Sequence, residues 1–274
     1  MLITMKVLVA LLCSTILTAC VGDGNTTPTV TDIQAKSLTY GARAEFDFFG
    51  TYLDKGLSAT VPNCTGQAPA FISPIQQVLQ CTITAVGDLK VEVRDGGGSV
   101  IFSKTFTVPP PRVALVTSLG NIVVELDPAK APATANNFLR YAQGGFYSNT
   151  IFHRVIAGFV IQGGGFTSGL VAVPGALAPI ALESNTGLSN LRGTIAMART
   201  AEPGSATSQF YFNLVDNPPL DYRDAGNPGY AVFGRIVQGT EVMDAIGASP
   251  TGTVNGYTDV PVTDIAVKSA LRIQ

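Results

Sequence analysis

An arginine and a glutamine stand in an otherwise apolar stretch of the chain, residues 151–166, which reads IFHRVIAGFVIQGGGF. A guanidinium carries five N–H donors and a permanent charge, so burying it without a partner is costly. If both halves of the stretch are strands, Arg154 and Gln162 have the same parity and face the same side, with residues 157–158 as a bulge between them. The bulge resets the pleat, so Phe159 joins that face. The stretch therefore predicts a site made of a fixed cation, an amide and an aromatic wall.

Two interpretations of Arg154 are open on spacing alone. Its guanidinium either meets a ligand, which could approach the bare backbone of residues 163–165, or pairs with a carboxylate of the protein such as Glu183. His153 is the only histidine of the chain. It alternates to the opposite side of the strand, so we predict a structural role for it.

The residues needed for hydrolytic, metal or phosphate chemistry are missing from the sequence. His153 is the only candidate histidine base, no Gly-x-Ser-x-Gly or His-Glu-x-x-His motif occurs, and no usual Cys/His metal spacing is present. Residues 163–165 are not followed by the Gly-Lys-Ser/Thr of a phosphate loop. We therefore expect neither a metal nor a cofactor. A net charge of −2 argues against nucleic acid as a partner.

Residues 29–108 predict a small antiparallel β-sandwich. The segment contains short alternating runs separated by glycine-rich turns, at 44–49, 79–85, 89–93 and 100–108. It resembles the immunoglobulin-like modules of bacterial surface proteins, and we expect a spacer, with a ligand-binding module as the alternative. Cys64 and Cys81 are predicted to form a disulfide worth about 3 kcal/mol in an exported compartment. Two free buried thiols are the alternative.

The first nineteen residues, 1–19, predict a signal peptide. Lys6 is the only charge before an apolar run at 7–17 that is too short to span a bilayer. The sequence Leu-Thr-Ala-Cys at 17–20 resembles the lipobox of bacterial lipoproteins, which implies that Cys20 becomes a lipidated N-terminus and residues 20–28 a tether. An ordinary signal peptide with an incidental Cys20 is the alternative. Because Val21 is not an aspartate, an outer membrane facing the periplasm is favoured.

Three prolines at 109–111 predict an extended linker, since they cannot continue a sheet. The segment that follows, residues 112–274, begins with a hairpin pattern and then carries helical periodicity at 132–142 and 240–246. Most of the remainder reads as strands with glycine-rich turns. This order favours an antiparallel barrel with helices at its ends.

Residues 152–169, FHRVIAGFVIQGGGFTSG, resemble the signature of the cyclophilins, whose usual form is FHRVIPGFMIQGGDF. The resemblance continues in order through GTIAMART at 193–200, SATSQFY at 205–211 and YAVFG at 230–234. It covers about residues 112–274, and the branch resembled is the bacterial exported one. It implies a mainly β protein, an eight-stranded antiparallel barrel capped by two helices, that isomerises X–Pro peptide bonds.

The resemblance also implies roles, carried over by position. Arg154 corresponds to the catalytic arginine, Gln162 orients it and the substrate carbonyl, and Phe159 belongs to the same catalytic set. The other substrate-binding positions are Val160, Ala198, Arg199, Gln209, Tyr211, Leu220 and Tyr230. Of these, Val160, Tyr211 and Leu220 line the proline-ring pocket with Phe159.

Two positions depart from the family pattern. Tyr211 replaces the usual phenylalanine, and its hydroxyl needs a partner. Pro219 stands where the family often has tryptophan and its bacterial members phenylalanine, so we expect weak cyclosporin binding. The expected partners are unfolded or flexible proteins with X–Pro bonds, and a membrane reached through the lipid anchor. A catalytically weak proline-peptide-binding or chaperone-like lipoprotein is the alternative function.

Overall fold

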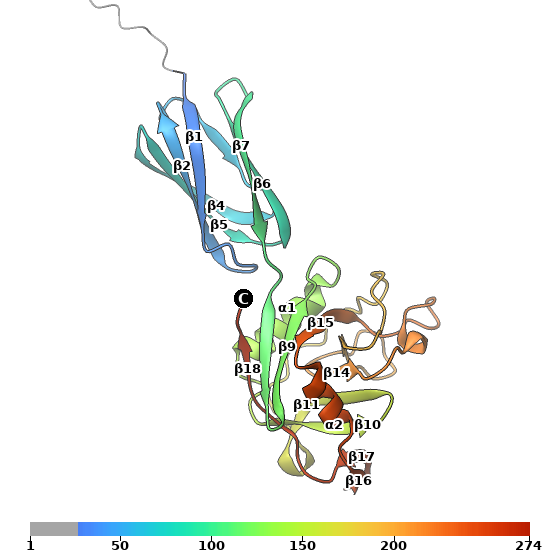
Figure 1. Ribbon diagram of the computed structural model, residues 1–274. Coiled ribbons are helices and arrows are strands. Elements are labelled where there is room, and N and C mark those ends of the chain that lie inside the picture. The colour runs from blue at the N-terminus through green and yellow to red at the C-terminus, as the bar shows by residue number, and fades with distance from the viewer. Residues whose placement is uncertain (1–26) are drawn as a thin grey trace, which may run out of the picture.

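The structure is a computed structural model that describes residues 27–274. The predicted signal peptide, Cys20 and most of the tether lie outside the described residues. The chain forms an N-terminal domain of two small sheets and a larger C-terminal domain, joined end to end (Figure 1). None of the helices in residues 27–274 is long and apolar enough to cross a membrane.

The N-terminal domain consists of two antiparallel sheets. The first has the strand order β1 (Thr29–Lys36), β2 (Arg43–Thr51), β5 (Gln76–Ile83) and β4 (Cys64–Ser73), and the second has the order β3 (Ser58–Thr60), β6 (Gly87–Arg94) and β7 (Val100–Val108). Alternate residues of these strands are buried, among them Ile33, Phe46, Ile83 and Val91, as a two-sheet core requires. A disulfide joins Cys64 to Cys81, with 5.5 Å between their Cα atoms.

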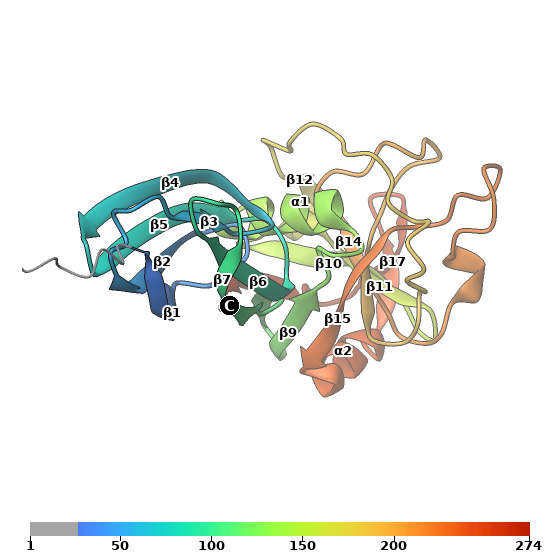
Figure 2. The same ribbon diagram turned by 90° about the horizontal axis from the view of Figure 1, so that it is seen from above.

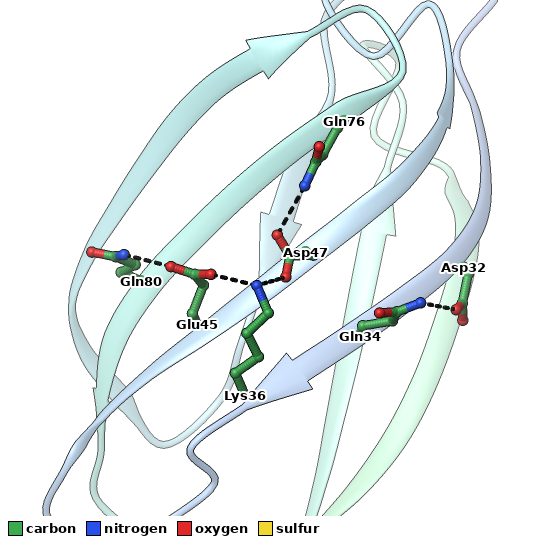
Figure 3. Close-up of polar contacts among 7 residues, drawn as sticks. All are labelled: Asp32, Gln34, Lys36, Glu45, Asp47, Gln76 and Gln80. Carbon is green, nitrogen blue, oxygen red and sulfur yellow. Dashed lines mark hydrogen bonds and ion pairs between the residues drawn. The ribbon is translucent and has the colours of Figure 1, made fainter.

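A network of polar side chains lies across strands β1, β2 and β5 (Figure 3). The Lys36 ammonium lies 2.9 Å from a Glu45 carboxylate oxygen and 2.7 Å from one of Asp47, whose side chain is only 3% exposed. These contacts, with Asp47 first, raise the pKa of Lys36 above its ordinary value. Gln80 donates to Glu45 at 2.7 Å, and Gln76 donates to Asp47 at 3.1 Å. Since the charges of β1 and β2 are paired with each other and the β5 glutamines donate to the same carboxylates, the network holds strand register.

The two domains are joined by the three prolines between β7 and β8 (Arg112–Thr117). A second connection comes from β18 (Ala266–Arg272), where the Arg272 guanidinium donates to the Tyr40 carbonyl at 2.5 Å. Near the C-terminus the chain therefore returns to the base of the N-terminal domain.

Eight antiparallel strands close the C-terminal domain into a barrel, as predicted. Around it run β10 (Thr150–Ile156), β18, β8, β9 (Gly120–Leu126), β15 (Val232–Gln238), β13 (Thr194–Met197), β14 (Phe210–Asn213) and β11 (Val160–Thr167), and β11 pairs back with β10. Outside this circle lie β12 (Val171–Ala172), the hairpin of β16 (Thr251–Val254) and β17 (Tyr257–Pro261), and two short 3₁₀ helices, η1 (Ser168–Leu170) and η2 (Pro218–Leu220).

Both predicted helices are present, as α1 (Pro132–Gln143) and α2 (Thr240–Gly247). From α1, the Phe138 ring enters the barrel core and lies 5.2–5.5 Å from the rings of Tyr147, Phe210 and Phe233. The second helix, α2, buries Val242, Met243 and Ile246. Figure 2 shows the long loops between β11 and β15 beside the strands of the barrel. With its interior filled by aromatic rings, the barrel can bind a ligand only on its outer surface.

Candidate active site

Residues 151–166 fold as a hairpin rather than as two strand halves separated by a bulge. β10 ends at Ile156, β11 begins at Val160, and the two strands pair antiparallel. The predicted bulge at 157–158 is wrong, because Gly158 has a φ of 70° and the Phe159 N–H donates to the Ile156 carbonyl at 3.0 Å, which reverses the chain. Arg154 and Gln162 share a face because they are direct cross-strand partners.

The register of the barrel produces a row of side chains across its outer surface. From Arg154 on β10, successive cross-strand partners are Gln162 on β11, Tyr211 on β14, Ala196 on β13 and Val232 on β15. The last three belong to a small buried apolar cluster that is separate from the main core. The row therefore begins with a cation and an amide and ends in an apolar surface.

Arg154 is held by amides and not by a carboxylate. Its Nη1 lies 3.4 Å from the Gln162 Oε1, and the Gln162 Nε2 donates to the Gln209 Oε1 at 2.9 Å. Within residues 27–274, no carboxylate oxygen lies within 4.0 Å of this guanidinium. Glu183 instead accepts the Thr134 N–H at 2.8 Å, at the start of α1. The interpretation of Arg154 as the partner of Glu183 is thus wrong, and most donors of the guanidinium remain available to a ligand.

The glycines at 163–165 are required by the protein's own packing. Gly164 has a φ of 84°, and a Cβ there would lie 2.9 Å from the Phe210 ring. A Cβ on Gly165 would lie 2.6 Å from the Gln209 side chain, and one on Gly163 would lie 3.1 Å from the Ile151 carbonyl oxygen. The prediction that this backbone is left bare for a ligand is therefore wrong. Gly165 instead makes room for Gln209, the residue that holds Gln162.

A cavity of about 210 Å³ lies over the row. It is lined by nine of the ten predicted catalytic and substrate-binding residues, namely Arg154, Phe159, Val160, Gln162, Ala198, Arg199, Tyr211, Leu220 and Tyr230. The tenth, Gln209, lines an adjoining hollow of about 150 Å³ that shares Gln162, Ala198 and Arg199 with the first. The structure thus brings all ten together, with an apolar wall suited to a small ring beside a guanidinium and an amide.

Sequence reasoning missed a group of buried amides behind the apolar wall. The Tyr211 hydroxyl donates to the Asn190 Oδ1 at 2.7 Å, which supplies the partner that this tyrosine needs. Asn213 donates to the same oxygen at 3.2 Å, and Asn217 donates to Asn213 at 2.8 Å and to the Phe159 carbonyl at 3.2 Å. These bonds fix both the floor and the lip of the cavity. The available signal was a single residue, Asn213, which directly follows the aromatic run at 210–212.

The rim of the cavity is built by Arg199 and Tyr230. The Arg199 guanidinium lies 4.7 Å from the centre of the Tyr230 ring, and its Nε donates to the Gly229 carbonyl at 2.9 Å. The Tyr230 ring in turn stands edge-on to Tyr211 at 5.8 Å. Pro219 is exposed in η2, next to Leu220, which reaches the cavity. The contact between Arg199 and the Tyr230 ring holds the rim in place, and no carboxylate of residues 27–274 forms a salt bridge with Arg199.

His153 plays no part in the cavity. It is buried on the other side of β10, where its ring lies 4.8 Å from Phe166, and its Nδ1 has no hydrogen-bond partner among the described residues. Burial, aided by the nearby charge of Arg154, lowers the pKa of His153 to about 4. The imidazole is therefore neutral through the physiological range, which fits a structural role.

A larger cavity of about 640 Å³ lies between the N-terminal domain and the barrel, but its chemistry is poorer. Its lining is mostly apolar. Of its charged residues, Glu125 and Arg235 are paired with each other at 2.8 Å, and the Asp127 carboxylate accepts the Lys130 N–H at 3.1 Å. The smaller cavity, with an unpaired cation beside an apolar wall, is the better candidate for catalysis.

The barrel matches a known protein family. The family described as "Cyclophilin type peptidyl-prolyl cis-trans isomerase/CLD" matches residues 112–271, directly after the three prolines. Peptidyl-prolyl cis-trans isomerase A of Dickeya dadantii (strain 3937) is 51% identical over 164 residues, which is 59% of this chain and 84% of the relative. Peptidyl-prolyl cis-trans isomerase B of Escherichia coli (strain K12) is 47% identical over 159 residues, 57% of this chain and 96% of the relative.

Solved structures agree on the architecture. A cyclophilin type peptidyl-prolyl cis-trans isomerase from Cryptosporidium parvum superposes with a TM-score of 0.52 at 27% identity, covering 60% of this chain and 98% of that one. Its structure in the presence of the dipeptide Ala-Pro gives a TM-score of 0.51 at 28% identity, covering 60% of this chain and 99% of that one. The closed barrel with two helices is therefore a cyclophilin fold. The chain belongs to the cyclophilin-type peptidyl-prolyl cis-trans isomerases.

The buried histidine should make stability depend on pH. Because the pKa of His153 is about 4 when folded and about 6.5 when unfolded, the unfolded chain binds a proton first as the pH falls. The neutral His153 therefore contributes fully to the free energy of unfolding above about pH 6.5. This contribution, up to about 3 kcal/mol, is lost as the pH falls from about 6.5 to 4. We expect His153→Phe to lose less stability over this range than the wild type, as measured by urea unfolding at several pH values. Equal losses in the two proteins would contradict this account.

The buried asparagines behind the apolar wall predict different effects for substitutions of Tyr211 and of Asn190, which contact each other. Tyr211→Phe removes one hydrogen bond but leaves Asn190 paired with Asn213, so we expect a loss of only about 1 kcal/mol of stability and little change in activity. Asn190→Ala removes three side-chain hydrogen bonds at once, those to Tyr211, Asn213 and Asp221, and leaves the buried Tyr211 hydroxyl without its acceptor. It should cost at least about 2 kcal/mol of stability and weaken activity. Urea unfolding and isomerase assays of both variants test this ranking, and equal effects would overturn it.

Proposed function

We propose that this isomerase works by aiming the Arg154 guanidinium at the nitrogen of an X–Pro bond whose ring sits in the 210 Å³ cavity. The observation that carries the proposal is a guanidinium fixed by Gln162 and free of any carboxylate in residues 27–274, beside the apolar surface of Tyr211 and Leu220. A protein that only bound peptides would have no need for a cation at this point.

Rotation of an X–Pro bond can be catalysed by a fixed cation beside an apolar pocket. Rotation about an X–Pro bond faces a barrier of about 20 kcal/mol because the amide is partly a double bond, and exchange takes tens of seconds. A turnover of about 10 to 1000 per second needs roughly 3–7 kcal/mol of transition-state stabilisation. As the bond twists, conjugation is lost and the prolyl nitrogen becomes basic. A fixed cation then stabilises the twisted state more than either planar state.

The substrates that suit this site are exposed X–Pro bonds in unfolded or flexible chains. The cavity has a volume of about 210 Å³ and lies on the outside of the barrel, so the peptide needs to present its proline ring on a mobile segment. Exposed Pro219 offers no ring N–H and no aromatic wall at the rim, which favours weak binding of cyclosporin.

We place this activity in the cell envelope. The support comes from the apolar run at 7–17, the lipobox-like sequence ending in Cys20, and a disulfide between Cys64 and Cys81 of the kind that exported proteins keep. The N-terminal domain would then act as a spacer. Its larger polar network pairs its own charges, which leaves few groups for a ligand.

The test is isomerisation of a short Ala-Pro peptide by the full chain, its Arg154→Ala variant and, as a matched control, Arg140→Ala on the exposed surface of α1. We expect the rate to fall at least about 100-fold with Arg154→Ala, equivalent to about 3 kcal/mol, and to be unchanged with Arg140→Ala. The wild-type rate should stay constant between about pH 6 and 9, since the guanidinium keeps its charge. An active Arg154→Ala variant would refute the proposed role.

A further inference from the structure

Four large apolar side chains are exposed at one end of the N-terminal domain. They are Tyr52, Phe71, Ile72 and Ile75, with 47%, 59%, 56% and 62% of their surface accessible. Phe71 and Ile72 lie near the end of β4, and Ile75 lies in the turn that leads to β5. We call these four residues the apolar tip. Leaving so much apolar surface in water is unfavourable, which points to a partner.

The apolar tip lies where the described chain begins. Thr29, the first residue of β1, is the cross-strand partner of Thr51 on β2. The Leu53 N–H, one residue beyond Tyr52, donates to the Pro74 carbonyl at 2.8 Å, and the Gly50 N–H donates to the Ile75 carbonyl at 3.2 Å. The start of β1, the loop with Tyr52 and the turn with Ile75 are thus tied together.

The same end of the domain lies away from the barrel. β7 leads from the N-terminal domain into the linker at its opposite end, and Figures 1 and 2 both show β1 beginning far from the barrel. Cys20 precedes Thr29 by nine residues, so a fully extended tether reaches at most about 30 Å. That is roughly the length of one strand of this domain.

We propose that the apolar tip contacts the lipid surface to which Cys20 is anchored. This inference rests on the proposed lipid anchor, and the short tether is what keeps the tip near that surface. The nearby loop charges do not oppose the contact: Asp54 and Lys55 are paired at 3.0 Å, and the Asp95 carboxylate accepts the Gly97 and Ser99 N–H groups at 2.9 Å each. Aromatic and aliphatic side chains of this kind enter the boundary between headgroups and acyl chains.

The contact would give the N-terminal domain a second function besides that of a spacer, namely to orient the protein on the membrane. A tether alone lets a barrel lean in any direction, whereas a second point of attachment holds the domain upright. The barrel, at the other end, is then held away from the membrane with its cavity open to passing chains.

The test uses the absence of tryptophan from the chain. The full chain, processed in a bacterial envelope, is reconstituted in phosphatidylethanolamine–phosphatidylglycerol vesicles whose acyl chains carry bromine, a quencher of tryptophan. Phe71→Trp places a reporter in the apolar tip, and Val262→Trp places a control at an exposed apolar position of the barrel. We expect a side chain at 71 to lie about 5–10 Å into the boundary and its emission to be quenched at least about twofold more than the control.

Two further variants test the tip as a unit. In the Phe71→Trp background, Ile72→Ser with Ile75→Ser should reduce the quenching to the level of the control. The matched pair Leu271→Ser with Ile273→Ser, at exposed positions of the barrel end, should leave it unchanged. Equal unfolding midpoints would show that the substitutions leave the fold intact.

The outcomes separate the two proposals. Protein that floats with vesicles but shows equal, weak quenching at positions 71 and 262 refutes the tip contact and leaves the anchor standing. Protein that does not float refutes both the anchor and the tip contact. Isomerase activity measured on the same samples reports on the catalytic proposal alone. Self-association of the chain through Phe71 in place of quenching would assign the tip to a second copy and would also refute the lipid contact.

Discussion

The site depends on keeping a guanidinium charged, partly buried and unneutralised. A carboxylate beside Arg154 would satisfy the charge and also cancel the field that a twisting peptide needs. The protein meets this constraint with amides: Gln162 accepts from the arginine and donates to Gln209, and Gly165 makes room for that second glutamine. Because amides are neutral, they orient the cation without screening it.

The barrel register then decides what lies next to the cation. Four antiparallel pairings align Arg154, Gln162, Tyr211, Ala196 and Val232 in one row, so the charge and the ring-binding surface have a fixed separation. A slip of one residue in any pairing would turn one member of the row to the other face. The aromatic core and the buried asparagines behind Tyr211 hold that register. Packing inside the barrel therefore fixes the positions of the side chains on its outer surface.

Local patterns in the sequence predicted much of this, and their failures share a cause. The two helices, the linker prolines and the charged face of 151–166 follow from residue spacing, and the barrel follows from the order of elements and a family signature. The turn at Gly158 was predicted as a bulge because Ala-Gly permits either, and only pairing between β10 and β11 decides. Asn190 was missed because its partners Tyr211 and Asn213 are more than twenty residues away in the chain. The glycines at 163–165 were assigned to a ligand because the side chains that fill their space come from distant segments.

The central claim is that Arg154 acts on the twisted bond and contributes little to peptide binding. It is tested most directly by NMR exchange spectroscopy of an Ala-Pro peptide with the wild type and Arg154→Ala, since the cis–trans exchange rate and the Kd come from the same samples. We predict a rate lower by at least about 100-fold with a Kd changed by less than about threefold. A Kd that weakens in step with the rate would contradict the account, because the arginine would then be holding the peptide and not the transition state.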